Sequence, residues 1–226
     1  MKQLPYIIYI MADDLGYGDL SCFGQQVLST PNIDQLAVEG TRFTNCYAGS
    51  PVCAPSRSVL MTGMHTGHTH VRGNGSDKVD KPYPLNRVPL RPKDTTVAQV
   101  LKKAGYVTGI TGKWGLGEPG TTGMPNKKGF DAWMGFLNQN YAHNYYPEYI
   151  WKNEEKYPLP GNLNGQEGQY VHDFFIEFAL DFIQKYQDTT FFLYYSITLP
   201  HAQYEIPDAD LAPFIDKPWE EREKVQ

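Results

Sequence analysis

The stretch YIIYIMADD, residues 6–14, decides the fold class, because it begins with an unbroken apolar run. The run ends in two carboxylates, Asp13 and Asp14. A continuous apolar run of this length, without polar alternation, is typical of a strand buried on both faces of a parallel sheet. Residues 106–110 and 191–197 have the same character. The pattern therefore predicts buried parallel strands over residues 6–11, 106–110 and 191–197.

Helical patterns lie between these strands. Residues 30–40, TPNIDQLAVEG, begin with an N-cap threonine and a proline at the first helical position, and they end in glycine. Residues 97–104 keep helical spacing, with Asp94 as the candidate cap. Residues 170–186 carry a single apolar stripe, which predicts a helix packed on the core. Strands that alternate with helices indicate an α/β domain with a mainly parallel sheet flanked by helices.

Residues 112–168 differ from the rest, because they are rich in Gly, Pro, Asn and Tyr and show little periodicity. Long segments of this kind in compact domains tend to be functional, so we predict an irregular excursion over the active face. A net charge of −5 and the lack of a basic cluster argue against nucleic acid as a partner. The longest apolar run is shorter than the about 20 residues that span a bilayer. It also lacks the flanks of a signal peptide, so we expect a soluble chain without a membrane span.

The residues that follow the strands are chemically informative, since ligands of open α/β sheets bind beyond the carboxyl ends of the strands. The predicted strands end in Asp13-Asp14, in Lys113 and in His201. Two carboxylates, an amine and an imidazole should therefore gather at one edge. Adjacent carboxylates beside glycines suit a hard divalent cation, and a solvated acidic loop is the alternative. Lys113 could provide a fixed positive charge for an anionic substrate, and a surface lysine is the alternative. His201 could donate a proton to a leaving group or bind an anion, and a structural histidine at the strand end is the alternative.

Residues 53–63, CAPSRSVLMTG, place a cysteine beside residues that favour the start of a helix. Cys53 should lie just before a helix N-terminus, where the dipole and free N–H groups favour an anion. Arg57 adds positive charge one turn later. A thiol in this place would be a reactive thiolate, and a buried cysteine acting as a small hydrophobe is the alternative. Cys22 and Cys46 could form one bridge, but three cysteines make no disulfide framework.

CAPSRSVLMTG resembles the sulfatase signature Cys-x-Pro-Ser-Arg-x-x-x-Leu-Thr-Gly, with Met61 at the leucine position. The stretches YIMADDLGYGDL, TPNIDQLAVEG, TGKWGLG and LPHAQ are similar to further motifs of that family, in the family's order. Over about residues 5–205 the chain resembles the N-terminal part of a type I, formylglycine-dependent sulfatase of the alkaline-phosphatase-like superfamily. We therefore expect residues 1–226 to form the N-terminal part of a sulfatase catalytic domain.

The resemblance implies a chemistry for Cys53. A formylglycine-generating enzyme would oxidise it, and one hydroxyl of the hydrated aldehyde would attack sulfur while the other drives release of sulfate. Asp13, Asp14 and residue 53 would bind Ca²⁺, with Mg²⁺ as the alternative. Arg57 would orient the hydrated aldehyde. The implied substrate is a sulfated carbohydrate or an aryl sulfate, and the implied location is periplasmic or secreted, with a cytoplasmic location left open by the lack of a signal peptide.

By the same resemblance, Lys113 and His201 would hold the sulfate and support departure of the leaving group. The family's lysine motif commonly reads Gly-Lys-Trp-His-Leu-Gly, and Gly115 stands here at the histidine. His143 is our candidate to replace that histidine, the alternatives being a substrate contact and a surface residue. Arg72 and Asn74, in HTHVRGNG, are candidate substrate contacts.

Calcium takes six to eight oxygen ligands, more than the matched residues supply. The family provides a further Asp-Asn pair and a second lysine later in the chain, and this sequence contains no Asp-Asn dipeptide. We therefore expect an incomplete sulfatase. The alternatives are a phosphonate or phosphate diester hydrolase of the same superfamily and a non-catalytic fragment.

Overall fold

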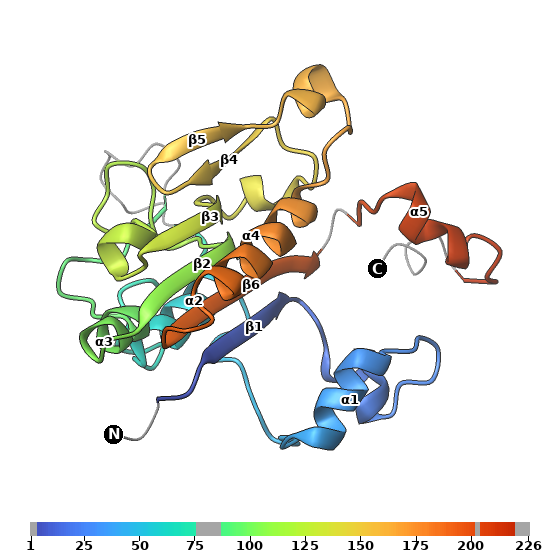
Figure 1. The fold of residues 1–226 in the computed structure, drawn as a ribbon, viewed down its shortest axis with the longest axis horizontal. Coiled ribbons are helices and arrows are strands. Elements are labelled where there is room, and N and C mark those ends of the chain that lie inside the picture. The colour runs from blue at the N-terminus through green and yellow to red at the C-terminus, as the bar shows by residue number, and fades with distance from the viewer. Residues whose placement is uncertain (1–3, 76–86, 202–203, 220–226) are drawn as a thin grey trace.

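The computed structural model describes residues 4–75, 87–201 and 204–219. Its centre is a six-stranded sheet in the order β1-β6-β2-β3-β4-β5 (Figure 1). The strands are β1 (Ile7–Asp13), β2 (Val107–Lys113), β3 (Ala132–Phe136), β4 (Tyr149–Lys152), β5 (Glu155–Pro158) and β6 (Phe191–Pro200). Strands β1, β6, β2 and β3 run parallel, and β4 and β5 add an antiparallel hairpin. The predicted mainly parallel α/β sheet is confirmed.

Helices pack on both faces of this sheet (Figure 1). The α-helices are α1 (Pro31–Glu39), α2 (Cys53–Thr62), α3 (Val97–Lys103), α4 (Val171–Lys185) and α5 (Asp208–Leu211). The 3-10 helices are η1 (Tyr17–Asp19), η2 (Ser21–Phe23), η3 (Pro125–Lys128), η4 (Tyr141–His143), η5 (Pro160–Gly165) and η6 (Ala212–Phe214). None of the helices in the described part of the chain is both long and apolar enough to cross a membrane.

Alternation along β6 divides the core between the two faces. Phe192 and Tyr194 join a cluster with buried residues of α2 and α3, whereas Phe191 and Leu193 join one with Ala179 and other residues of α4. Side chains of successive strand residues point to opposite faces, so one apolar run serves both layers. The apolar stripe predicted for residues 170–186 is confirmed as core, since α4 buries its residues at helical spacing.

The prediction that the first strand is buried is wrong. Ile8, Tyr9 and Ile10 of β1 are exposed, with Ile10 at 59%. Among the described residues β1 pairs only with β6, and α1 lies away from the sheet at the end of a separate excursion (Figure 1). The apolar run therefore identifies a strand but not what covers it.

The prediction of an irregular excursion over residues 112–168 is also wrong in part, since the segment supplies β3, β4 and β5. These strands have 5, 4 and 4 residues, too short for periodicity to be recognised against the glycines and asparagines around them. The remainder of the segment is made of loops and 3-10 helices.

Two expected helix caps differ in detail. Thr96, not Asp94, caps α3, because its side chain accepts a hydrogen bond from the Gln99 N–H, and Asp94 instead binds Arg91. Thr30 occupies the N-cap position of α1 without making a side-chain cap hydrogen bond. The cysteines are all free thiols, so no Cys22–Cys46 bridge forms.

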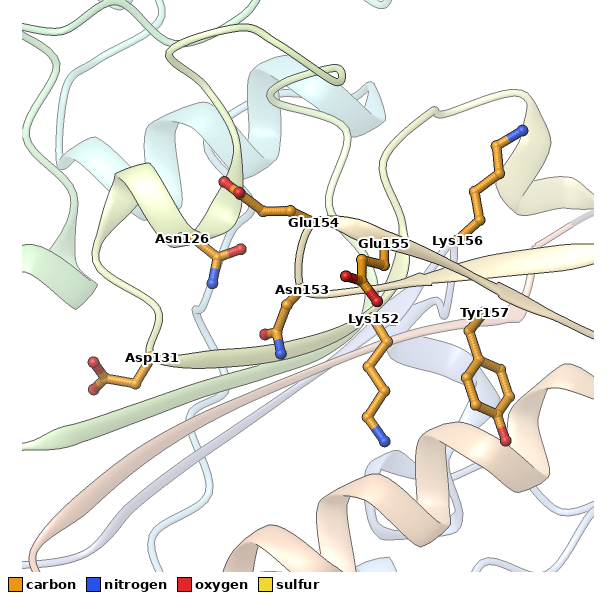
Figure 2. A pocket seen from close by; sticks show the side chains of 8 residues that line it. All are labelled: Asn126, Asp131, Lys152, Asn153, Glu154, Glu155, Lys156 and Tyr157. Carbon is orange, nitrogen blue, oxygen red and sulfur yellow. The ribbon is translucent and has the colours of Figure 1, made fainter.

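A hollow of about 790 Å³ lies at the turn of the β4–β5 hairpin, lined by Asp131, Asn153, Glu154 and their neighbours (Figure 2). Asp131 immediately precedes β3, and Asn153 Oδ1 accepts from the N–H of Trp133 near the start of that strand. The hollow is therefore at the amino end of the parallel strands, opposite to the edge where the sequence predicts chemistry.

Candidate active site

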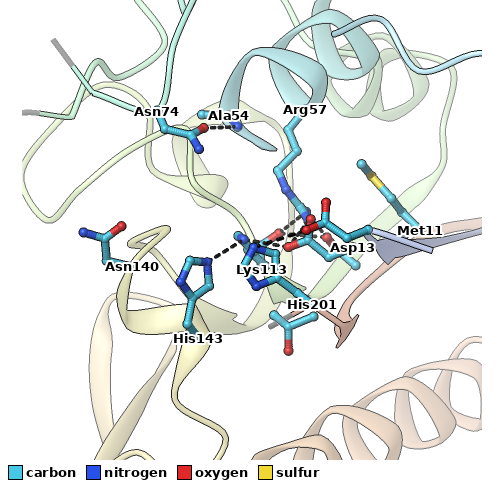
Figure 3. Close-up of polar contacts among 12 residues, drawn as sticks. Met11, Asp13, Ala54, Arg57, Asn74, Lys113, Asn140, His143 and His201 are labelled. Atoms are coloured by element: carbon cyan, nitrogen blue, oxygen red, sulfur yellow. Dashed lines mark hydrogen bonds and ion pairs between the residues drawn. The ribbon is translucent and has the colours of Figure 1, made fainter. Parts of the chain in front are cut away.

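The carboxyl ends of β1, β2 and β6 bring their polar residues together (Figure 3). Lys113 Nζ donates to Asp13 Oδ2 at 2.6 Å, and Arg57 Nη2 lies 3.5 Å from the same oxygen. All three side chains are buried. Burial by itself would raise the pKa of Asp13, but the charges of Arg57 and Lys113 outweigh it and lower that pKa. Asp13 is therefore a carboxylate that two cations share.

Arg57 is fully buried, as is Lys113, with an exposed fraction of 0% for each. Its Nη1 donates to the Lys113 carbonyl at 2.7 Å, to Tyr194 Oη at 3.3 Å and to Ser196 Oγ. Its Nε and Nη2, although buried, have no hydrogen-bond partner in the described part of the chain. A buried guanidinium with unused donors is a site for an anionic oxygen.

Ser196 and Tyr194 were not among the predicted site residues. Both lie on β6, and Ser196 Oγ also donates to the Lys113 carbonyl at 2.8 Å. Serine interrupts an otherwise apolar run, FFLYYSI. A hydroxyl within a buried strand needs a partner, and this interruption is the feature of the sequence that could have revealed it.

Two histidines, His143 and His201, lie beside Lys113. The rings of His143 and His201 stack with centroids 4.0 Å apart, and His143 Nε2 lies 3.4 Å from Lys113 Nζ. Burial, together with the charges of Lys113 and His201, lowers the pKa of His143 to about 4. His143 is therefore neutral at physiological pH and can accept a hydrogen bond from the ammonium. Tyr145 Oη donates to the His201 carbonyl at 2.7 Å and anchors that turn.

Cys53 is the first residue of α2, one position further into the helix than predicted. Its Sγ, a carboxylate oxygen of Asp13 and a ring nitrogen of His201 all lie within 4.8 Å of one another. Asn74 Oδ1 accepts from the N–H of Ala54 at 2.9 Å, so Asn74 lies beside the helix start. The positive end of α2 is thus directed at the cluster.

Two carboxylates of the cluster offer oxygen ligands to a cation. Asp13 and residue 53 are already within reach of a common point. Asp14 has φ +66, and its Oδ2 lies 3.5 Å from His201 Nε2. Its side chain is 62% exposed, which leaves it room to turn toward a cation. Carboxylate oxygens are the ligands that Ca²⁺ and Mg²⁺ prefer, so Asp13 and Asp14 suit such an ion. The Cys53 thiol is a soft ligand, and residue 53 suits the same ion only when an oxygen replaces its sulfur.

Arg72 is the one predicted residue that the structure does not bring into the cluster. Its guanidinium donates to the carbonyls of Thr69 at 3.1 Å and Gly67 at 2.6 Å, which ties it to its own loop.

The structure gives a reason for glycine at residue 115, where the family motif commonly has histidine. The φ of Gly115 is +74, and an added Cβ would lie 1.5 Å from Gln139 Nε2. Gln139 thus occupies the space that a side chain at residue 115 would need.

The sulfatase family model matches residues 5–223. The chain belongs to the sulfatase family. N-acetylgalactosamine-6-sulfatase from Sus scrofa is 34% identical over 216 residues, covering 88% of this sulfatase chain and 40% of the relative. Human arylsulfatase A is 42% identical over 144 residues, covering 63% and 27% of the two chains. The expected family membership is confirmed, and this chain spans about 40% of the length of the N-acetylgalactosamine-6-sulfatases that it matches.

Solved structures support the sulfatase fold. The crystal structure of Ps i-CgsB in complex with k-i-k-neocarrahexaose has a TM-score of 0.81 and 30% identity, covering 99% of this chain and 51% of that one. The structure of BT4656 in complex with its substrate D-glucosamine-2-N,6-O-disulfate has a TM-score of 0.77 and 27% identity, covering 96% and 39%. Both comparisons extend over nearly the whole of this chain, so the expected sulfatase-like architecture is confirmed.

Proposed function

We propose that the protein hydrolyses sulfate esters of glycans, with residue 53 as the nucleophile. One observation supports this most directly: in a cluster where two cations surround one carboxylate, the buried Arg57 has two nitrogens, Nε and Nη2, without a hydrogen-bond partner among the described residues. A cluster with that balance favours an added anion, and a sulfate oxygen supplies one.

The family resemblance gives residue 53 its proposed chemistry. Formylglycine at this position supplies a hydrated aldehyde as the nucleophile. Asp13, Asp14 and residue 53 would hold Ca²⁺, or Mg²⁺ as the alternative, which supplies Lewis acidity when bound. Arg57 lies one helical turn after residue 53, which supports a role for its guanidinium in orienting the group there.

The remaining residues have roles that their surroundings favour. Lys113 is held in place by Asp13 and by the neutral His143, so it presents a fixed positive charge to the sulfate. His201, anchored through its carbonyl, would donate a proton to the departing alcohol oxygen. His143 would orient Lys113 and not act as an acid, since its low pKa keeps it unprotonated.

The proposed substrate class follows from the relatives. Those matched include an N-acetylgalactosamine-6-sulfatase and a structure holding a disulfated glucosamine. On that basis the proposed substrate of this protein is a sulfated sugar. Such a substrate supports a periplasmic or secreted location, and a cytoplasmic location is the alternative.

Comparative turnover tests the proposal. Protein co-expressed with a formylglycine-generating enzyme should hydrolyse an aryl sulfate far faster than an aryl phosphate diester, and a Cys53→Ala variant should hydrolyse neither. The peptide that carries residue 53 should be lighter than its unmodified form, because one carbonyl oxygen replaces the sulfur and two hydrogens. Faster turnover of the diester, or an aryl sulfatase activity that survives Cys53→Ala, would contradict the proposal.

A further inference from the structure

A second pocket, of about 530 Å³, lies beside the catalytic cluster. Its lining includes Asn140 and Tyr141, the residues that lead into His143 through η4. Figure 3 shows Asn140 next to His143 at the margin of the cluster. The pocket is therefore continuous in sequence with the site, although it is not part of it.

Aromatic side chains form one wall of this pocket. Tyr149 and Trp151 alternate along β4 with Ile150, which is fully buried on the opposite face. Tyr141 stacks on Tyr149, with ring centroids 5.0 Å apart and planes at 30°. The tyrosine and tryptophan rings are half-buried, so part of their surface faces the cavity. This wall offers flat apolar surface with polar edges.

Charged groups border the same aromatic wall. Lys156 Nζ lies 3.9 Å from the centroid of the Tyr149 ring, a cation–π contact that holds the ammonium at the rim. Arg87 lines the pocket, and its Nε is buried without a hydrogen-bond partner among the described residues. Glu118 accepts from Asn138 Nδ2 at 2.8 Å and supplies a buried acceptor.

Arg87 connects the pocket to the catalytic cluster. Its positive charge acts on Glu118 in the pocket and also on His143 in the cluster. An anionic ligand that extends from the catalytic site into this pocket would therefore approach both Arg87 and Lys156. Among the described residues the Nε of Arg87 makes no hydrogen bond, and such a ligand could accept one from it.

We propose that this pocket is a glycan subsite, which binds a second, anionic sugar of the substrate next to the residue that is desulfated. The inference rests on the proposed function, because it assumes a glycan at the catalytic cluster. A pyranose ring has an apolar C–H face that packs on aromatic rings and a polar rim that needs donors and acceptors. The pocket pairs the two. Its two cations outnumber the single carboxyl of Glu118, and this balance favours a sulfated or carboxylated sugar.

The β4–β5 hairpin provides a matched pair of variants. Lys156 lines the pocket, whereas Lys152 does not, and both are exposed lysines that lie over a tyrosine ring. Figure 2 shows the two side chains pointing away from each other. Lys156→Glu should therefore weaken binding of an anionic glycan, and Lys152→Glu should carry the same change in net charge without that effect.

The test is calorimetric titration of Cys53→Ala protein, in which bound glycan is not consumed. The probes are sulfated hexasaccharides of chondroitin 6-sulfate, heparin and carrageenan, and the corresponding sulfated monosaccharides. At least one hexasaccharide should bind more tightly than its monosaccharide. Lys156→Glu should lower the affinity for that hexasaccharide by about fivefold or more, and Lys152→Glu should lower it by less than about twofold. Equal effects of the two variants would overturn the subsite, as would a wild-type protein that prefers none of the hexasaccharides.

A second pair tests the aromatic wall. Tyr149→Ala should lower the affinity for the hexasaccharide by about fivefold or more. Tyr157→Ala, on the other face of the hairpin against Phe174, should leave its affinity within about twofold once folding is verified. Wild-type turnover of an aryl sulfate separates this proposal from the catalytic one. Glycan binding with the predicted contrasts but no turnover would refute the proposed function alone, and turnover without the contrasts would refute the subsite alone.

Discussion

His172 should make the stability of this protein sensitive to mild acid. It lies on α4, is 2% exposed, and its Nε2 is 2.8 Å from Thr198 Oγ1. Tyr145 and Phe175 pack edge-on against its ring. Burial lowers the pKa of His172 to about 4, against an ordinary value near 6.5.

The direction of the effect follows from which state binds the proton. Between pH 6.5 and pH 4 the imidazole is protonated in the unfolded chain but neutral in the folded one. Unfolding therefore takes up a proton, and the free energy of unfolding falls as the pH falls. From the two pKa values, the loss is about 2 kcal/mol between pH 7 and pH 5 and about 3 kcal/mol between pH 7 and pH 4.

Urea unfolding of the wild type and of His172→Gln at pH 7, 6 and 5 measures this contribution. The glutamine amide can keep a hydrogen bond to Thr198 but does not titrate, so the variant should lose about 2 kcal/mol less than the wild type over this range. His172→Phe is the control for the hydrogen bond, since it should be less stable at pH 7 and yet show the same reduced pH dependence. If the wild type and His172→Gln lost equal stability between pH 7 and pH 5, the reasoning would be refuted.

Three further predictions concern the catalytic cluster and its scaffold. Gly112→Ala should lower the free energy of unfolding in urea by at least about 3 kcal/mol, because φ is +98 and the new Cβ would lie 1.9 Å from the Ser196 carbonyl oxygen. The control Gly18→Ala, whose Cβ would have nothing within 4 Å, should lower it by less than about 1 kcal/mol. Similar losses in the two variants would contradict the packing argument. Arg57→Leu should lower stability by about 3 kcal/mol and abolish aryl sulfate turnover, and a variant that keeps full turnover would rule out the proposed anion site. His143→Ala should reduce turnover by at least about tenfold while His143→Gln, which retains an acceptor for the Lys113 ammonium, retains more of it; equal activities of both variants and the wild type would exclude a role for this contact.

Much of the catalytic cluster could be predicted from local sequence. Asp13, Lys113 and His201 each follow an apolar run, and the ends of parallel strands meet at one edge whatever the details of packing. The helix that begins at Cys53 could be predicted from residues that favour a helix start, to within one position. These features depend on neighbours in the chain, which a sequence displays directly.

Other features depend on contacts between distant segments. Ser196 is recognisable as a partner of Arg57 only when β6 lies beside β2, and the two residues are 139 positions apart. The stacking of His143 on His201 likewise joins η4 to the end of β6. Candidate roles for His143 could be named from sequence, but its low pKa arises from burial and from charges that tertiary structure brings close.

The sequence by itself determined the three parallel strands β1, β2 and β6 with the helices between them, the edge of the sheet where chemistry gathers, and the motif around Cys53, because these are properties of short runs and of chain direction. Only the tertiary structure decided that β1 is exposed, that β3, β4 and β5 extend the sheet, and that an aromatic pocket lies next to the cluster. The physical reason is that burial, charge balance and cavity shape are sums over residues far apart in the chain. A periodic pattern specifies which side chains share a face, but not what that face meets.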